Sequence, residues 1–294
     1  MSVRYLLGVD VGTTSLKAAV FDENGNTVRS VTRDYTLLVS GDRVEFPPEE
    51  YWALFRSAFR EVTEGITLSG LAVDTQCETM ILTDKEGTPL TNAIVWLDNR
   101  ATAEAEEIKA AFGNKKVYET TGQPEITATW PAAKLLWVKK HMPDVFANIG
   151  RVFLLEDYLL YRMTGEFVTE KTLQSSSLYL DIVNGVWWQE MLDFIGVSAA
   201  IGAGVISGNV VSEMTGTTMA IFAPDRPMPP YDPQSIVPCH LNFDGKYCLL
   251  TWTPTAGIAL KWFKNQFCEQ FGFKELDELA AKVQPGSDGL VFLP

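Results

Sequence analysis

The chain has 294 residues, of which 46% are hydrophobic and 21% charged, a balance typical of a globular protein with room for two domains. The 37 acidic residues outnumber the 24 basic ones and give a formal net charge of −13, which argues against a nucleic acid or an anionic membrane as partner. Four cysteines without a Cys-x-x-Cys pair, two histidines and the lack of a membrane-spanning or signal segment indicate a cytoplasmic protein with reduced thiols and no histidine-based zinc site or triad.

The first segment, residues 5–22, is predicted to form a strand, a tight glycine turn and a second strand. An acid, a glycine, two hydroxyls and a lysine surround this turn, namely Asp10, Gly12, Thr13, Thr14 and Lys17. Such a turn can bind phosphate oxygens through its amides and hydroxyls, and the aspartate can hold a magnesium that keeps most of its waters. An ordinary tight hairpin with polar turn residues is the alternative. The spacing is not that of a Walker A loop, because no helix follows the glycine.

Further elements follow in chain order. A third strand over 28–35 completes a meander after a strong turn signal at 23–26. A helix begins at the two prolines 47–48 and ends at Gly65, with Trp52, Phe55, Phe59 and Val62 on one face. We then expect a buried strand over 71–74, a hairpin over 80–90, helices over 98–112 and 131–141, a short strand at 153–155, and helices over 156–163 and 187–194.

Beyond residue 196 a second hairpin is predicted over 210–223. Its turn contains Gly216, Thr217 and Thr218, which repeat the Gly-Thr-Thr of the first hairpin. The repetition suggests two related half-molecules that face one ligand. A strand over 249–251 and helices over 256–267 and 274–283 follow, and the apolar segment 290–294 predicts a strand with further sequence expected after it.

Four segments in this order resemble the FGGY family of carbohydrate kinases. They are GVDVGTTSLKAAVFD at 8–22, DTQCET at 74–79, AIVWLDNR at 93–100, and KLLW at 134–137 continuing to DYLLYRMTG at 157–165. The resemblance implies two ribonuclease-H-like α/β domains of the sugar kinase, actin and heat-shock-chaperone fold with a cleft between them. We place the N-terminal domain, with the phosphate hairpin and the sugar-binding segments, at 1–198 and a partial nucleotide-side domain at 199–294.

The family's motifs imply roles for single residues. Asp10 would hold magnesium and ATP. The phosphates would be bound by Gly12, Thr13, Thr14 and Lys17 from the first hairpin and by Gly216, Thr217 and Thr218 from the second, with Gly257 also on the nucleotide side. The sugar or polyol would contact Gln76, Cys77, Glu78, Trp96 and Asp98, with Arg100 nearby. For Asp98 and Arg100 the alternative is a helix start with a surface ion pair.

The implied function is ATP-dependent phosphorylation of a sugar or polyol hydroxyl, with ATP and a small polyol or ketose as partners and a homodimer left open. Xylulokinases usually show Met-His-Gly where this chain has Cys77-Glu78-Thr79, and glycerol kinases show Arg-Glu-Thr. Glu78 and Thr79 are therefore similar to glycerol kinases, whereas residues 134–138 are similar to xylulokinases. Glu78 can accept hydrogen bonds from two neighbouring hydroxyls.

The family's catalytic aspartate, in a GG-x-D-[QN] motif, has no counterpart here, because residues 194–199 run directly into the segment that should follow it. The later glycine-rich adenine segment is absent as well. Three explanations stay open: residues left out across a disordered stretch, a truncated protein, or a shortened homologue without kinase activity. The alternative function is thus an inactive sugar- or nucleotide-binding protein. Asp232, in a proline-rich loop, and Asp244 are not assigned to the catalytic role.

Overall fold

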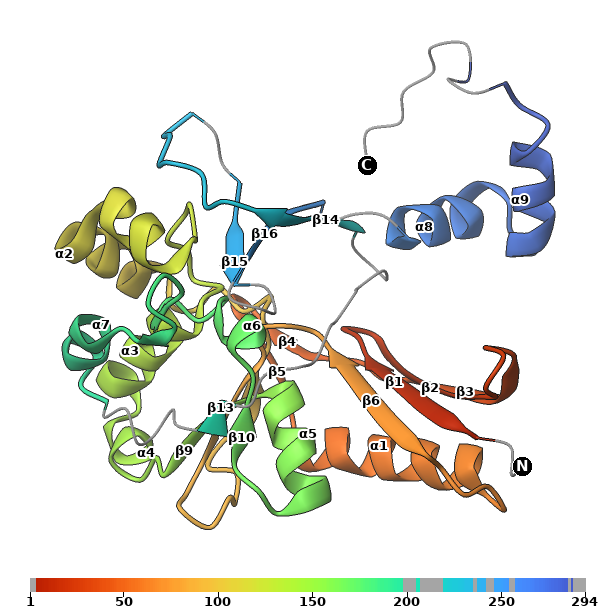
Figure 1. Cartoon of the computed structure of the whole chain (residues 1–294), viewed down its shortest axis with the longest axis horizontal. Coiled ribbons are helices and arrows are strands. Elements are labelled where there is room, and N and C mark those ends of the chain that lie inside the picture. Colours follow the sequence, from red (N-terminus) through yellow and green to blue (C-terminus); the bar gives the residue numbers. More distant parts are fainter. Residues whose placement is uncertain are drawn as a thin grey trace. The chain divides into compact units, whose positions relative to one another are not determined.

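The computed structural model describes residues 4–197, 205–206, 219–234, 237–241, 246–253, 257–284 and 287 (Figure 1). It divides into two compact units. The first comprises residues 1–212 and 222–250, and the second comprises 213–221 and 251–294. The predicted boundary at 198/199 falls on residues outside the described ones and stays a prediction.

The N-terminal part of the first unit is a four-stranded sheet with the order β3-β2-β1-β6. Its strands are β1 (Leu6–Val11), β2 (Ser15–Phe21), β3 (Thr27–Asp34) and β6 (Gly70–Thr75). The first three are antiparallel neighbours, and β6 runs parallel to β1 with Asp10 beside Asp74. The carboxyl ends of β1 and β6 therefore bring two carboxylates to the same edge of the sheet.

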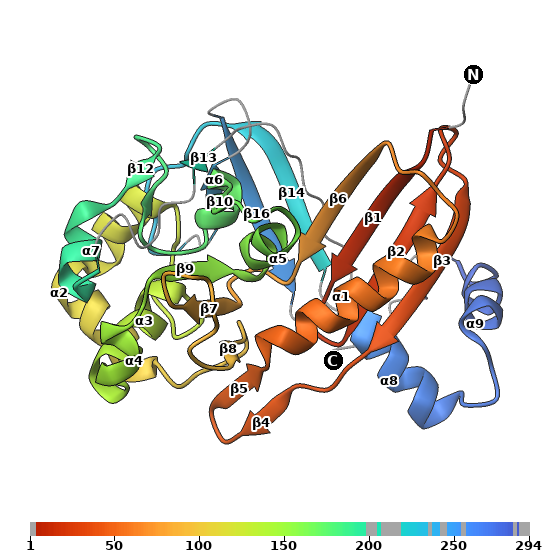
Figure 2. The same ribbon diagram turned by 90° about the horizontal axis from the view of Figure 1, so that it is seen from below.

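Helix α1 (Pro48–Thr63) lies along one face of this sheet (Figure 2). Its first turn combines Pro48 at the first helical position with two acids, a sequence that favours a helix N-terminus. The buried stripe consists of Tyr51, Phe55, Ala58 and Val62. The predicted face was centred on a neighbouring stripe, since Trp52 and Phe59 are only half-buried.

A five-stranded sheet follows, with the order β4-β5-β8-β7-β9. Its strands are β4 (Leu38–Ser40), β5 (Arg43–Phe46), β8 (Ala93–Ile94), β7 (Met80–Thr83) and β9 (Arg151–Leu154). The predicted hairpin over 80–90 has only one regular arm, because its return is a single bridge between Thr83 and Pro89.

Helices and short strand pairs complete the first unit. The helices are α2 (Thr102–Thr121), α3 (Pro131–His141), α4 (Pro143–Ala147), α5 (Leu155–Thr164), α6 (Lys171–Gln174) and α7 (Gln189–Ile195). The strand pairs are β10 (Val168–Thr169) with β13 (Val205–Ile206), and β11 (Leu180–Asp181) with β12 (Val186–Trp187). The predicted helix over 98–112 begins four residues later than expected and continues through a kink at Gly113.

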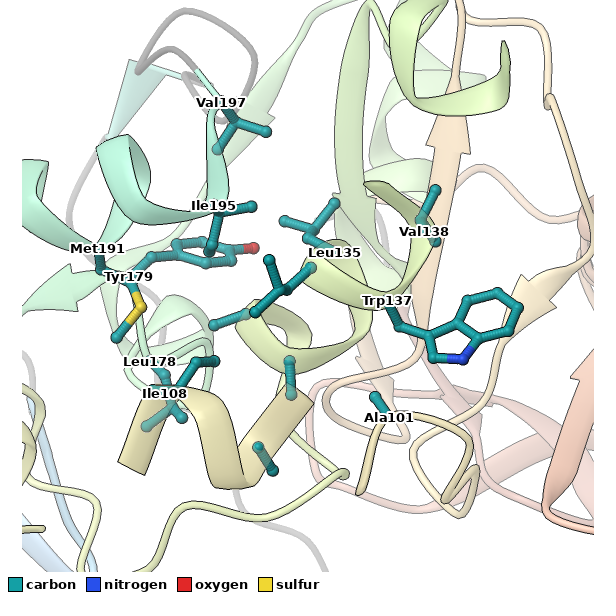
Figure 3. Packing of buried hydrophobic residues seen from close by; sticks show 14 of the residues in the cluster. Ala101, Ile108, Leu135, Trp137, Val138, Leu178, Tyr179, Met191, Ile195 and Val197 are labelled. Carbon is teal, nitrogen blue, oxygen red and sulfur yellow. The ribbon is translucent and has the colours of Figure 1, made fainter. Parts of the chain in front are cut away.

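A core of buried apolar side chains surrounds α3 (Figure 3). Leu135, Trp137 and Val138 of α3 pack with side chains of α2, α7 and the segment before β11. Every residue from 131 to 138 is buried, including Lys134. Over residues 131–138, helix α3 is therefore buried on all sides rather than exposed to solvent on one face.

The last elements are β14 (Met219–Arg226), β15 (Cys239–Leu241), β16 (Tyr247–Thr253), α8 (Gly257–Phe267) and α9 (Phe273–Ala280). The three strands form a sheet with the order β14-β16-β15, and the chain passes between the two units within β14 and β16. The predicted strand over 249–251 and the two predicted helices are confirmed. Across the described ranges, no helix is both long and apolar enough to cross a membrane. All four cysteines are free, as expected.

Candidate active site

The predicted phosphate hairpin is present as the β1–β2 turn. Asp10 and Lys17 are cross-strand partners, and Lys17 Nζ lies 3.5 Å from Asp10 Oδ2. Both side chains are well exposed, so this ion pair contributes little to stability and both groups remain accessible to a ligand. Gly12 donates its N–H to the Ser15 carbonyl at 3.0 Å. A Cβ at Gly12 would make only ordinary contacts, which shows that the turn itself does not require glycine.

A hydrogen bond joins this turn to the second predicted segment. The indole Nε1 of Trp96 donates to Thr13 Oγ1 at 3.1 Å, across 83 residues of sequence. The backbone N–H of Trp96 also lies 3.3 Å from Thr79 Oγ1. A hydroxyl that accepts one hydrogen bond keeps its own proton for another acceptor. Thr13 can therefore accept from Trp96 and donate to a phosphate oxygen at the same time.

Gln76 is held in place by two tyrosines. Its Nε2 donates to Tyr51 Oη at 2.8 Å and lies 3.4 Å from Tyr35 Oη. Burial raises the pKa of both phenols, which keeps them neutral. Gln76 Oε1 is buried and has no partner among the described residues. An unpaired buried oxygen is costly, so a ligand hydroxyl that donates to it would be favoured.

Glu78 differs from its neighbours in backbone and in charge. Its φ of 58° lies in the left-handed region, which is uncommon for a residue other than glycine. Burial raises the pKa of its carboxyl to about 7, while a hydrogen bond with Ser176 and the charge of Lys134 oppose this rise. The adjacent Cys77 thiol has its pKa raised by burial and then by nearby carboxylates, so it is a neutral thiol rather than a reactive thiolate.

Lys134 contacts the segment that carries Trp96, although in the sequence it stood out only as part of the KLLW motif at 134–137. It is fully buried on α3, and its Nζ donates to the Val95 carbonyl at 2.9 Å and lies 3.4 Å from the Trp96 carbonyl. Burial lowers its pKa to about 7, against the charges of Asp98 and Glu78, which raise it. A lysine within an otherwise apolar stretch, Ala132 to Val138, was the signal available in the sequence.

Asp98 and Arg100 form a buried ion pair rather than the surface pair that was considered. Arg100 donates from Nε to Asp98 Oδ1 at 2.8 Å and from Nη2 to Oδ2 at 2.7 Å. The backbone N–H groups of Arg100 and Val44 add two further hydrogen bonds to the carboxylate. Four donors thus occupy the Asp98 carboxylate, which favours a structural role over direct contact with substrate. No helix starts here, because α2 begins at Thr102.

Helix α5 carries two carboxyl groups with raised pKa values, of which Glu156 acts on Cys77. Burial raises the pKa of Glu156 to about 8, with further rises from Asp157, Asp74 and Glu170. Burial also raises the pKa of Asp157 to about 7, and this residue is only 2% exposed. Three carboxyl groups, those of Glu78, Asp74 and Glu156, therefore act on the Cys77 thiol.

The described residues hold no group of three or more histidine, cysteine or acidic side chains that could bind a metal by themselves. Magnesium does not need one, because it commonly keeps several waters and binds one or two carboxylates together with substrate phosphates. Asp10, with a side chain 39% exposed and Asp74 beside it in the parallel register, fits this requirement.

Some predicted residues cannot be joined to this site. Gly216, Thr217 and Thr218 lie outside the described residues, as does Asp244. Gly257 is the first residue of α8 in the second unit. Asp232 accepts the N–H of Gln234 at 2.8 Å in its own turn, which agrees with a loop role.

Comparison with known proteins gives related enzymes. A xylulose kinase from Lactococcus lactis is 25% identical over 341 residues, which cover 99% of this chain and 67% of the relative. A gluconokinase from Bacillus subtilis is 24% identical over 347 residues, with coverages of 99% and 67%. The first alignment is 47 positions longer than the 294 residues of the chain, so it includes gaps in this chain.

The fold is also that of solved kinases. The ligand-bound xylulose kinase from Lactobacillus acidophilus superposes with a TM-score of 0.81 at 24% identity, over 99% of this chain and 68% of that one. The family model for the N-terminal domain of FGGY carbohydrate kinases matches residues 5–222. The chain therefore belongs to the FGGY family of carbohydrate kinases.

Proposed function

We propose that this family member transfers the γ-phosphoryl group of ATP to a hydroxyl of a neutral polyol or ketose. The observation that carries this proposal is the hydrogen bond between Trp96 and Thr13, because it brings the polyol segment against the phosphate hairpin. In phosphoryl transfer the protein mainly positions the two substrates and stabilises charge. A site in which these two segments touch is suited to that task.

On the phosphate side, the proposed roles are those that the family's motifs imply. Thr13 and Thr14 would donate to phosphate oxygens, and Lys17 would add a positive charge beside them. Asp10 would hold a magnesium ion, which neutralises phosphate charge when it is bound with ATP. Gly216, Thr217, Thr218 and Gly257 would complete the nucleotide site from the rest of the chain.

On the polyol side, Glu78 and Gln76 would accept hydrogen bonds from substrate hydroxyls. The indole face of Trp96 would pack on the carbon skeleton, and Cys77 would contact it as a small neutral side chain. Asp98 would contribute indirectly, through Arg100. The same side chains favour a neutral substrate above about pH 8, where Glu78 and Glu156 are ionised and would repel the carboxylate of a sugar acid.

The test is ADP release by the purified protein with ATP, magnesium and one acceptor at a time. Xylulose, ribulose, glycerol and erythritol represent neutral acceptors, gluconate represents sugar acids, and a reaction without acceptor measures background ATP hydrolysis. We expect turnover with at least one neutral acceptor and little with gluconate. Turnover with gluconate alone would contradict the proposed substrate class.

The inactive alternative gives a different result in a parallel experiment. A protein that binds without turnover would gain thermal stability from ATP or a polyol yet release no ADP. Thr13→Val is the test variant in both measurements, because it keeps the shape of the side chain but removes the hydroxyl that accepts the Trp96 hydrogen bond. It should weaken the effect of ATP in either case.

A further inference from the structure

The side chain of Lys134 is fully buried in the described part of the first unit. A buried ammonium group is costly unless partners compensate for its lost hydration. The partners are two main-chain carbonyls, Val95 at 2.9 Å and Trp96 at 3.4 Å. Both belong to the segment that presents Trp96 to the site.

The charge of Lys134 also acts on the second polyol residue, Glu78, whose pKa it lowers. The charged groups around Lys134 are Asp98 and Glu78, which favour its cationic form, and Arg100, which opposes it. Around Glu78 the groups are Lys134 and the Ser176 hydroxyl, with the Cys77 thiol next to it in sequence. Asp98, which favours the cationic form of Lys134 more than Glu78 does, is itself paired with Arg100 at hydrogen-bonding distance.

A hydrogen bond connects the first turn of α3 to the segment that follows α6. The Ala132 N–H donates to the Ser177 carbonyl at 3.1 Å. The segment that carries Ser176 is therefore tied to the helix that carries Lys134. A displacement of Lys134 would disturb its contacts with the Val95 and Trp96 carbonyls.

We propose that Lys134 is a positioning residue of the polyol site, which holds the main chain of Val95 and Trp96 through its two carbonyl contacts. This rests on the proposed function, in which Trp96 and Glu78 contact the polyol. Lys134 itself contacts no substrate. Its loss should therefore weaken polyol binding and leave ATP binding and the phosphoryl step largely intact.

The test compares three variants. Lys134→Met removes the charge and the donors at similar length, Lys134→Gln retains N–H donors without the charge, and Lys139→Met is the matched control on the same helix. For Lys134→Met we expect the KM for polyol to rise about tenfold, with kcat changed less than threefold and the KM for ATP unchanged. Lys134→Gln should lie between Lys134→Met and the wild type. A folded Lys134→Met protein with an unchanged KM for polyol would overturn the proposal.

A second measurement does not depend on turnover. Because a nearby cation favours the ionised form of a carboxyl, loss of Lys134 should raise the pKa of Glu78. Carbon-13 NMR of labelled glutamate, assigned with Glu78→Gln, measures this midpoint, and the indole resonance of Trp96 should shift as well. No change in either signal would contradict the proposal. If the wild type phosphorylates no acceptor, the proposed function fails while this measurement still decides the role of Lys134.

Should Lys134→Met fail to fold, Glu78→Gln reports on the same pair from the other side. It removes the carboxylate that stabilises the ammonium, so the pKa of Lys134 should fall, as nitrogen-15 NMR of the lysine side chains would show. An unchanged lysine midpoint would contradict the pairing.

Discussion

Trp96 connects the two halves of the candidate site, and its indole nitrogen is the atom that does so. Trp96→Phe keeps most of the ring but removes the hydrogen bond to Thr13 Oγ1. One hydrogen bond of this kind is worth about 1 kcal/mol, so we expect kcat/KM to fall about fivefold. Trp130→Phe is the matched control, because it also loses an indole hydrogen bond, to the Glu125 carbonyl, away from Thr13. Equal losses in both variants would argue against a special role for the Trp96–Thr13 contact.

Asp98 was predicted from its motif to contact substrate, and the geometry favours a different role. Asp98→Asn would leave the buried Arg100 without its main counter-charge, which typically costs about 3 to 5 kcal/mol. We expect a large fall in the free energy of unfolding, measured by urea denaturation. Glu45→Gln should cost much less, since Glu45 makes one contact to Arg100 and is partly exposed. A normal stability with a raised KM for polyol would instead support direct contact with substrate.

At the scale of elements, most of the regular structure followed from local patterns. The meander, the proline-initiated helix α1 and the apolar helix α3 each carry a strong periodic or capping signal. Short strands such as β4, β8 and β10 were missed, because two or three residues hold no period and pair only when another segment arrives. The start of α2 was also misplaced, since Asp98 looked like an N-cap but serves the buried ion pair.

Two glycines that end helices make a matched pair for a test. Gly122 and Gly165 have φ values of 74° and 78° and cap α2 and α5 in the same way. A Cβ at Gly122 would lie 1.9 Å from the Cys239 carbonyl oxygen, whereas nothing lies within 4 Å of one at Gly165. Gly165→Ala should therefore cost about 1 kcal/mol of stability and Gly122→Ala about 3 kcal/mol or more.

Thermal or urea denaturation of the two variants measures this difference. It tests the close approach of β15 to the end of α2, where the Cys239 N–H also donates to the Gly122 carbonyl at 2.9 Å. Equal losses in stability would show that this approach is looser than the structure indicates.

At the scale of the whole molecule, buried acids should make stability depend on pH in an unusual direction. The pKa of Asp157 is raised from 3.8 to about 7 by burial. Between these values the folded state binds the proton and the unfolded state does not, so stability is greatest at low pH and falls as pH rises towards 7. From pH 5 to pH 7 this group alone can remove about 2 kcal/mol.

Urea denaturation at pH 5, 6 and 7 checks this, with Asp157→Asn as the informative variant. The amide keeps an acceptor for the Leu154 N–H and the Gln174 side chain but does not titrate. We expect its stability to change less with pH than that of the wild type, while Asp144→Asn, on the surface, behaves as the wild type. Lys134 acts with the opposite sign only above pH 7, because its pKa is lowered from 10.5 to about 7.

The sequence by itself determined the family, its kinase chemistry and the β1–β2 hairpin, and it supplied the proposed phosphate and polyol residues. These rest on short contiguous motifs in which neighbouring residues act together. The tertiary structure decided which segments meet: Trp96 contacts Thr13, Arg100 pairs with Asp98, and Lys134 contacts the carbonyls of Val95 and Trp96. Burial sets these outcomes, because a charge that leaves water must find partners wherever the fold supplies them, and local sequence does not specify those partners.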